Sequence, residues 1–120
     1  MLWTNSKPSS SFAELSYANL SDDCHNYDAL KIDYKITATG TASTFAIYPK
    51  ESYGSTSSSP IYRIGLATGV INGNTYYRMV AKNYTGDGTK IFFSNAYAMA
   101  GGNTAYNSYC VPIDIYGLKY

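Results

Sequence analysis

The last part of the chain constrains the fold more than any other stretch. Residues 107–119 follow a loop rich in glycine and asparagine, and they carry β-branched residues at alternate positions. Val111, Ile113 and Ile115 are too apolar to stay in water, and burying three such side chains contributes roughly 5 kcal/mol in gross terms. We therefore expect this segment to form an interior strand of a β-sheet.

Segments of similar character recur along the chain and are separated by turn residues. The clearest is Leu30–Thr37, where apolar residues at even positions alternate with polar residues at odd positions. Further strands are expected at residues 12–20, 43–48, 61–67, 75–82 and 90–94. With the opening residues 2–5 and the final segment, this makes about eight short strands and no convincing amphipathic helix.

This pattern predicts an all-β fold, an antiparallel β-sandwich that is jelly-roll-like. The length of 120 residues suits a single domain spanning residues 1–120. Asn72-Gly73 predicts a tight hairpin, because both residues tolerate positive φ, and Thr85–Gly88 predicts a second turn.

Composition excludes several classes of partner. The net charge is +1 and the basic residues are scattered, so no nucleic-acid partner is expected. No apolar run has the length of a membrane helix, so we expect no membrane insertion.

Tyrosine is unusually common, with 14 residues, and suits both strands and wet contact surfaces. Cys24 and Cys110 are far apart in sequence and are expected to be reduced thiols.

One short segment gathers residue types that bind metals. Its members are Asp22, Asp23, Cys24, His25 and Asp28. A zinc site needs further ligands from elsewhere at suitable spacing, and a dedicated calcium loop has a glycine and a repeated ligand spacing that are missing here. We therefore predict no metal and no other cofactor.

Support for catalysis is equally thin. Adjacent residues of an extended segment point to opposite faces, so Cys24 and His25 are not expected to act together as nucleophile and base. A glycoside hydrolase needs two carboxylates at a controlled separation, and nothing in the sequence selects a pair among Glu14, Glu51 and Asp114. We predict that the chain is not an enzyme.

The two ends of the chain carry a family resemblance. The start has Leu-Trp-Thr-Asn at 2–5 and, after a Pro/Ser turn, Ser-Phe-Ala at 11–13, while Val-Pro-Ile-Asp-Ile-Tyr-Gly-Leu-Lys at 111–119 closes the chain. These motifs resemble a C-terminal β-domain of tail and other structural proteins from phages and prophages of Gram-positive, largely gut, bacteria. Asn19-Leu20-Ser21 and Tyr27-Asp28-Ala29 fit the middle of the pattern, although residues 22–26 are a longer insertion than the family shows. Between residues 37 and 90 the sequence matches the family pattern only weakly.

The resemblance implies a module of a virion or prophage appendage, such as a fibre tip. It implies a homotrimer, located on the virion, that contacts a host-surface glycan, and it implies no catalytic motif. Two alternatives stay open: a purely structural domain that trimerises or caps a fibre, and a small glycan hydrolase.

The residues themselves add some support for glycan binding. Sugar sites combine aromatic platforms with planar polar side chains, and the predicted loops supply both. The candidate residues in or beside these loops are Tyr53, Tyr84, Asp87, Tyr97, Asn103, Tyr106 and Asn107. For each of them a structural role is the alternative, with tyrosines packed over sheet edges and asparagines holding turns. Trp3 is expected to fill the core rather than to stack on a sugar.

Overall fold

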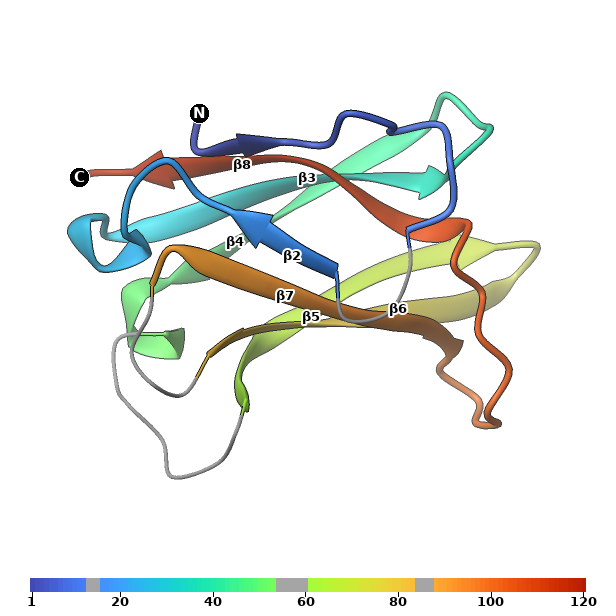
Figure 1. Ribbon diagram of the computed structural model, residues 1–120. Coiled ribbons are helices and arrows are strands. Elements are labelled where there is room, and N and C mark those ends of the chain that lie inside the picture. Colours follow the sequence, from blue (N-terminus) through green and yellow to red (C-terminus); the bar gives the residue numbers. More distant parts are fainter. Residues whose placement is uncertain (13–15, 54–60, 84–87) are drawn as a thin grey trace.

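The computed structural model describes residues 1–12, 16–53, 61–83 and 88–120 (Figure 1). The strands, in chain order, are β1 (Trp3–Thr4), β2 (Ser16–Asn19), β3 (Ala29–Thr37), β4 (Ser43–Pro49), β5 (Ile61–Ile71), β6 (Asn74–Asn83), β7 (Lys90–Ala98) and β8 (Tyr109–Leu118). Two short 3₁₀ helices, η1 (Cys24–Asn26) and η2 (Lys50–Ser52), follow β2 and β4. Neither helix is long and apolar enough to cross a membrane.

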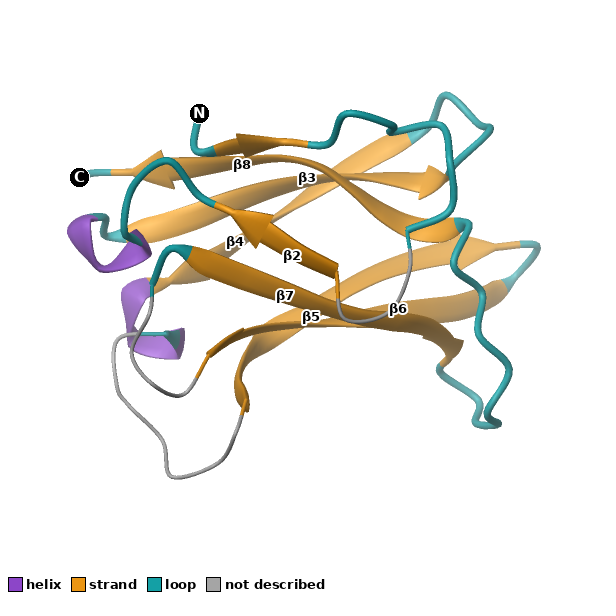
Figure 2. Ribbon diagram, viewed as in Figure 1, coloured by secondary structure: helices purple, strands orange, loops and turns teal. Residues whose placement is uncertain are grey.

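The strands form two antiparallel sheets that pack face to face (Figure 2). One sheet has the order β1-β8-β3-β4 and the other has the order β2-β7-β6-β5. The first two strands pair with the last two, β1 with β8 and β2 with β7. The predicted antiparallel β-sandwich of eight strands is confirmed, and β8 is an interior strand as its apolar sequence requires.

Predicted strand boundaries shift where alternation is a weak signal. The strand predicted at residues 61–67 continues to Ile71, and the one predicted at 90–94 continues to Ala98. The strand predicted at 12–20 is shorter, because β2 covers only Ser16–Asn19, while residues 13–15 and most of the turn predicted at 85–88 lie outside the described residues. The Asn72-Gly73 hairpin is confirmed, with φ of 52° and 80° at its two residues.

A bulge in β8 changes which of its side chains are buried. In the pairing of β3 with β8, Asp33 lies opposite Asp114, but the next residue, Tyr34, lies opposite Pro112. Ile113 is therefore the extra, unpaired residue of the bulge. Val111 and Ile115 are fully buried, but Ile113 is half-exposed. The prediction that all three residues share the buried face is therefore wrong for Ile113.

Aromatic side chains fill one part of the core between the sheets. Phe12 and Phe93 pack edge to face at 5.5 Å, and Trp3 contacts both rings at 6.1 and 6.3 Å. Trp3 is half-buried against the core, in line with its expected packing role.

Polar groups inside the sandwich form hydrogen bonds with one another. The Tyr34 and Tyr48 hydroxyls lie 3.0 Å apart, and the Tyr48 hydroxyl donates to the Leu66 carbonyl on the opposite sheet. Cys24 and Cys110 are both buried and are not joined by a disulfide.

Candidate functional site

A pocket of about 400 Å³ lies where the chain enters β8. It is formed by the end of the β7–β8 connection together with one residue from the segment between β1 and β2. Figure 1 shows these two segments side by side at one end of the sandwich, opposite the end that carries η1 and η2. The lining residues are Ser11, Ala105, Tyr106, Asn107, Ser108 and Tyr109. The volume falls in the range of small-molecule sites, which measure about 300–1,000 Å³.

Three tyrosines form an aromatic cluster at this pocket. The rings of Tyr106 and Tyr109 are parallel, with centroids 5.6 Å apart. Tyr76, on β6, meets both rings edge to face at 5.0 and 4.7 Å. All three side chains are half-buried, and burial raises the pKa of Tyr76. The mutual contacts hold the rings in fixed orientations, as an aromatic platform requires.

Backbone hydrogen bonds fix the segment that lines the pocket. The Tyr106 amide donates to the Ala96 carbonyl of β7, and the Ala38 amide at the end of β3 donates to the Ser108 carbonyl. The Phe12 amide donates to the Asn107 carbonyl, which joins the β1–β2 segment to the same loop. The pocket is therefore anchored to both sheets of the sandwich.

Arg78 anchors the backbone around the pocket. This side chain is fully buried, and its guanidinium donates to five backbone carbonyls. The acceptors are Phe12, Ser94, Asn107, Tyr109 and Cys110, at 2.8–3.3 Å. Burial lowers the pKa of Arg78 to about 10, so the guanidinium keeps its charge at neutral pH. Two of the carbonyls belong to Asn107 and Tyr109, which line the pocket, so Arg78 helps to fix the backbone of the pocket.

The polar groups of the pocket are neutral. The Ser11 and Ser108 hydroxyls lie 3.1 Å apart, and Asn107 adds an amide. The Oδ1 atom of Asn107 is buried and receives no hydrogen bond from any described residue. A buried acceptor without a donor costs about 1–3 kcal/mol, so this amide has unused hydrogen-bonding capacity.

The structure brings together only two of the residues that sequence analysis proposed for ligand binding. Tyr106 and Asn107 line the pocket, whereas Asn103 is exposed in the same loop outside it. Tyr97 lies on β7 rather than in a loop and packs beside Tyr77, with ring centroids 6.1 Å apart. Tyr84 and Asp87 lie outside the described residues.

Tyr53 needs a correction. It was expected in an exposed loop, but its side chain is fully buried and its hydroxyl donates to the Tyr27 carbonyl. Burial raises the pKa of Tyr53 well above its usual value. A ring enclosed in this way offers no face to a ligand.

Sequence analysis missed the other members of the site. Tyr76 and Tyr109 belong to strands and come from distant parts of the chain, so the search of predicted loops passed over them. Arg78 carries no usable signal, because Tyr77, Met79 and Ala81 make the odd-numbered positions of β6 the more apolar set, and alternation would place Arg78 on the solvent face.

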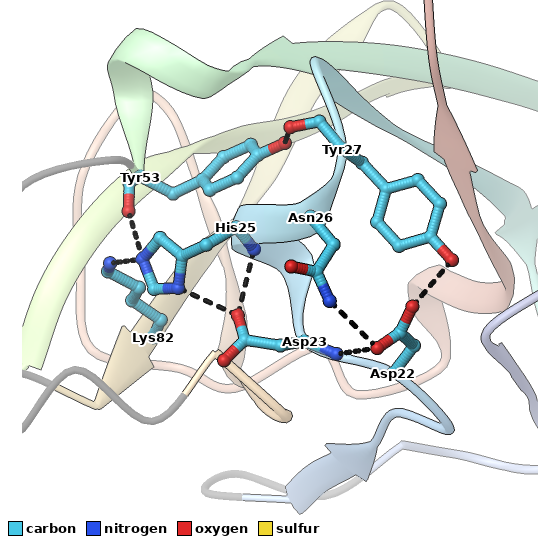
Figure 3. Close-up of polar contacts among 7 residues, drawn as sticks. All are labelled: Asp22, Asp23, His25, Asn26, Tyr27, Tyr53 and Lys82. Carbon is cyan, nitrogen blue, oxygen red and sulfur yellow. Dashed lines mark hydrogen bonds and ion pairs between the residues drawn. The ribbon is translucent and has the colours of Figure 1, made fainter.

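The opposite end of the sandwich holds a separate polar network (Figure 3). His25 Nδ1 lies 2.7 Å from Asp23 Oδ1, and His25 Nε2 lies 2.6 Å from Nζ of the buried Lys82. With the ring proton on Nδ1, the imidazole donates to the carboxylate and accepts from the Lys82 ammonium. Beside it, the Tyr27 hydroxyl donates to Asp22 and lowers the pKa of that carboxyl.

This network corrects the expectation for Cys24 and His25. The segment forms η1 instead of an extended chain, and the ligand atoms of Asp23, Cys24 and His25 lie within 4.8 Å of one another. The thiol is nevertheless fully buried, and both imidazole nitrogens already have polar neighbours. A metal ion would have to displace the Lys82 ammonium, so the arrangement favours a structural role.

No protein-family model matches the chain, and neither does any curated protein or solved structure.

Proposed function

We propose that this chain is a glycan-binding domain of a phage or prophage appendage. The resemblance of its two ends to phage structural proteins supports the appendage, and the tyrosine-lined pocket supports the ligand class. The domain would act on the virion, as a homotrimer that contacts glycans on the surface of the host. It would act by binding alone, without a chemical step.

The chemistry of the pocket is the observation that carries the proposal. Sugar rings present C–H faces that pack on aromatic rings, and hydroxyl groups that bond to amides and hydroxyls. Tyr106 and Tyr109 offer the first type of surface, and Asn107 offers the second. A sugar hydroxyl can supply the hydrogen bond that Asn107 Oδ1 lacks once the amide rotates toward the pocket.

The described lining residues carry no formal charge, so the ligand that fits best is a neutral saccharide. None of these residues has a carboxyl group, and a hydrolase would require two. The pocket therefore supports binding over hydrolysis. Affinity at a single small site would be weak, and assembly into a trimer would raise it by avidity.

An array of cell-wall and capsular glycans from Gram-positive gut bacteria tests this proposal. We expect wild-type protein to bind a subset of neutral glycans, and the Tyr106→Ala variant to lose at least about tenfold in affinity, equivalent to roughly 1.4 kcal/mol. Tyr97→Ala is the matched control, because it removes a half-buried tyrosine from β7 outside the pocket and should bind like the wild type. Absence of binding across the array, or equal losses in both variants, would overturn the proposal.

A further inference from the structure

Each sheet of the sandwich ends in two edge strands, and three of these four edges carry, over at least part of their length, a feature that limits pairing with other chains. In the first sheet β1 has only two residues, and in the second sheet β2 has only four. The remaining edge, β5, is protected at its start by the exposed Arg63 and by an irregular register between Arg63 and Gly65, and two glycines interrupt the rest of the strand. Short edges, charged side chains and bulges are the devices by which β-proteins avoid edge-to-edge association.

The fourth edge, β4, has none of these devices along most of its length. It spans seven residues, pairs with β3 from Ala29↔Pro49 to Lys35↔Ser43 without a shift in register, and contains no charged residue. Two large apolar side chains on it are open to solvent, with Phe45 58% and Ile47 48% exposed. Pro49 is its only protective residue and stands at its very end.

The hydrogen bonds between β3 and β4 show which backbone groups face outward. The Ile36 amide donates to the Ala42 carbonyl, and the Lys50 amide donates to the Asp28 carbonyl. In an antiparallel ladder, hydrogen-bonded and non-hydrogen-bonded pairs alternate, so even-numbered residues of β4 bond to β3. The amides and carbonyls of Phe45 and Ile47 therefore point to the open edge, beyond which no described strand lies.

We propose that β4 of one copy of this chain pairs with β4 of a second copy. The two strands run antiparallel around a twofold axis, with Ala46 facing Ala46 of the partner copy. This register makes Phe45 and Ile47 of the partner copy a hydrogen-bonded pair, and symmetry repeats that pair once. An aromatic ring beside a β-branched side chain is a favourable cross-strand combination.

The sequence of β4 favours a second copy over an unrelated strand. The strand is uncharged, so its alignment with itself sets no like charges opposite each other. Its outward apolar side chains cover each other in the same arrangement that satisfies the backbone. A twofold contact of this kind closes at two copies and leaves no further β4 edge exposed.

The contact is small, so we expect the two copies to associate weakly. A stable protein–protein interface buries about 1,200–2,000 Å², and pairing of one edge strand falls below that range. We therefore expect association that depends on protein concentration. The inference rests on the edge of the sheet alone and is independent of glycan binding. It is also distinct from a trimer, which uses a threefold contact.

Sedimentation velocity over a concentration series tests the pairing. The mass of the wild-type particle should rise toward twice its low-concentration value as the protein concentration increases, whereas the mass of Ile47→Lys should stay at its low-concentration value. Val70→Lys is the matched control, because Val70 is 63% exposed on β5, and this variant should behave like the wild type. Equal masses for wild type and Ile47→Lys, or the same fall in both variants, would overturn the inference.

Engineered cysteines test the register and do not depend on the strength of association. Facing residues of a non-hydrogen-bonded pair have Cα atoms about 4.5 Å apart, which is within reach of a disulfide. Ala46→Cys should therefore form a covalent dimer under mild oxidation. Thr44→Cys should not, since its symmetry mate is about 13 Å further along the strand. A dimer from Thr44→Cys, or none from either variant, would reject the twofold register.

Discussion

At the scale of single residues, Arg78 connects the fold to the candidate site. One buried guanidinium joins carbonyls from the β1–β2 segment, from β7 and from the start of β8. Cys110, one of the acceptors, has a φ of 51°, a left-handed conformation that costs a non-glycine residue about 1 kcal/mol. The backbone thus adopts a strained conformation at the point where it presents carbonyls to Arg78.

Replacing Arg78 with lysine should destabilise the protein although the charge is kept. Lysine has three donors where arginine has five, so at least two buried carbonyls would lose their partners. At about 1–3 kcal/mol for each such group, the free energy of unfolding should fall by at least about 2 kcal/mol in urea titrations. Arg63→Lys, at an exposed position of β5, should change it by less than about 0.5 kcal/mol. Similar losses in both variants would contradict the role given to Arg78.

Cys110 should make stability depend on pH in the alkaline range. Burial raises the pKa of its thiol from 9.0 to about 11. Between these values the unfolded chain loses the proton that the folded chain retains, so this contribution to stability is complete below pH 9 and is lost as the pH rises toward 11. Unfolding titrations from pH 8 to 11 should therefore show a steeper decline for wild type than for Cys110→Ala. Parallel declines would show that the thiol is not protected in the folded state.

At the scale of elements, β8 shows how far alternation can be trusted. Its β-branched residues correctly predicted an interior strand, because a sheet edge would leave them in water. The bulge opposite Asp33 then moves Ile113 out of the buried face, while Pro112 becomes fully buried. Alternation alone treats Ile113 and Ile115 as equivalent, and the structure does not.

Replacing each of these two isoleucines by alanine tests whether they are equally buried, as alternation predicts, or differently buried, as the structure shows. Ile115→Ala empties a fully buried site between the sheets and should cost about 2–5 kcal/mol in the free energy of unfolding. Ile113→Ala removes a half-exposed side chain and should cost markedly less. Chemical denaturation of the two variants measures the difference. Equal costs would mean that the bulge is absent in solution.

Local signals predicted most of the strands, and long-range packing decided the rest. Leu30–Thr37 and the Asn72-Gly73 turn were predictable because alternation and positive φ are properties of neighbouring residues. The burial of Tyr53 was not, since polar residues precede it and its enclosure depends on contacts with Tyr27 and His25 from another loop.

At the scale of the whole molecule, the two ends of the sandwich have different characters. One end holds the Asp23–His25–Lys82 network, in which two half-buried side chains and the buried Lys82 hydrogen-bond to each other. The other end holds an open pocket with aromatic faces. The sequence predicted Tyr106 and Asn107 there because both lie beside a Gly/Asn-rich loop, but Tyr76 joins them only through the pairing of β6 with β7.

Mapping of bound glycan by NMR on ¹⁵N-labelled protein shows whether the tyrosine-lined pocket is the glycan site. Neutral oligosaccharides prepared from the cell walls of Gram-positive gut bacteria would be titrated into the full chain. If the pocket binds glycan, saturable shifts should appear at Ser11 and at residues 105–109, with smaller shifts at Tyr76, which contacts the lining rings. No saturable shifts, or shifts confined to η1 and η2 at the other end, would contradict glycan binding at the pocket.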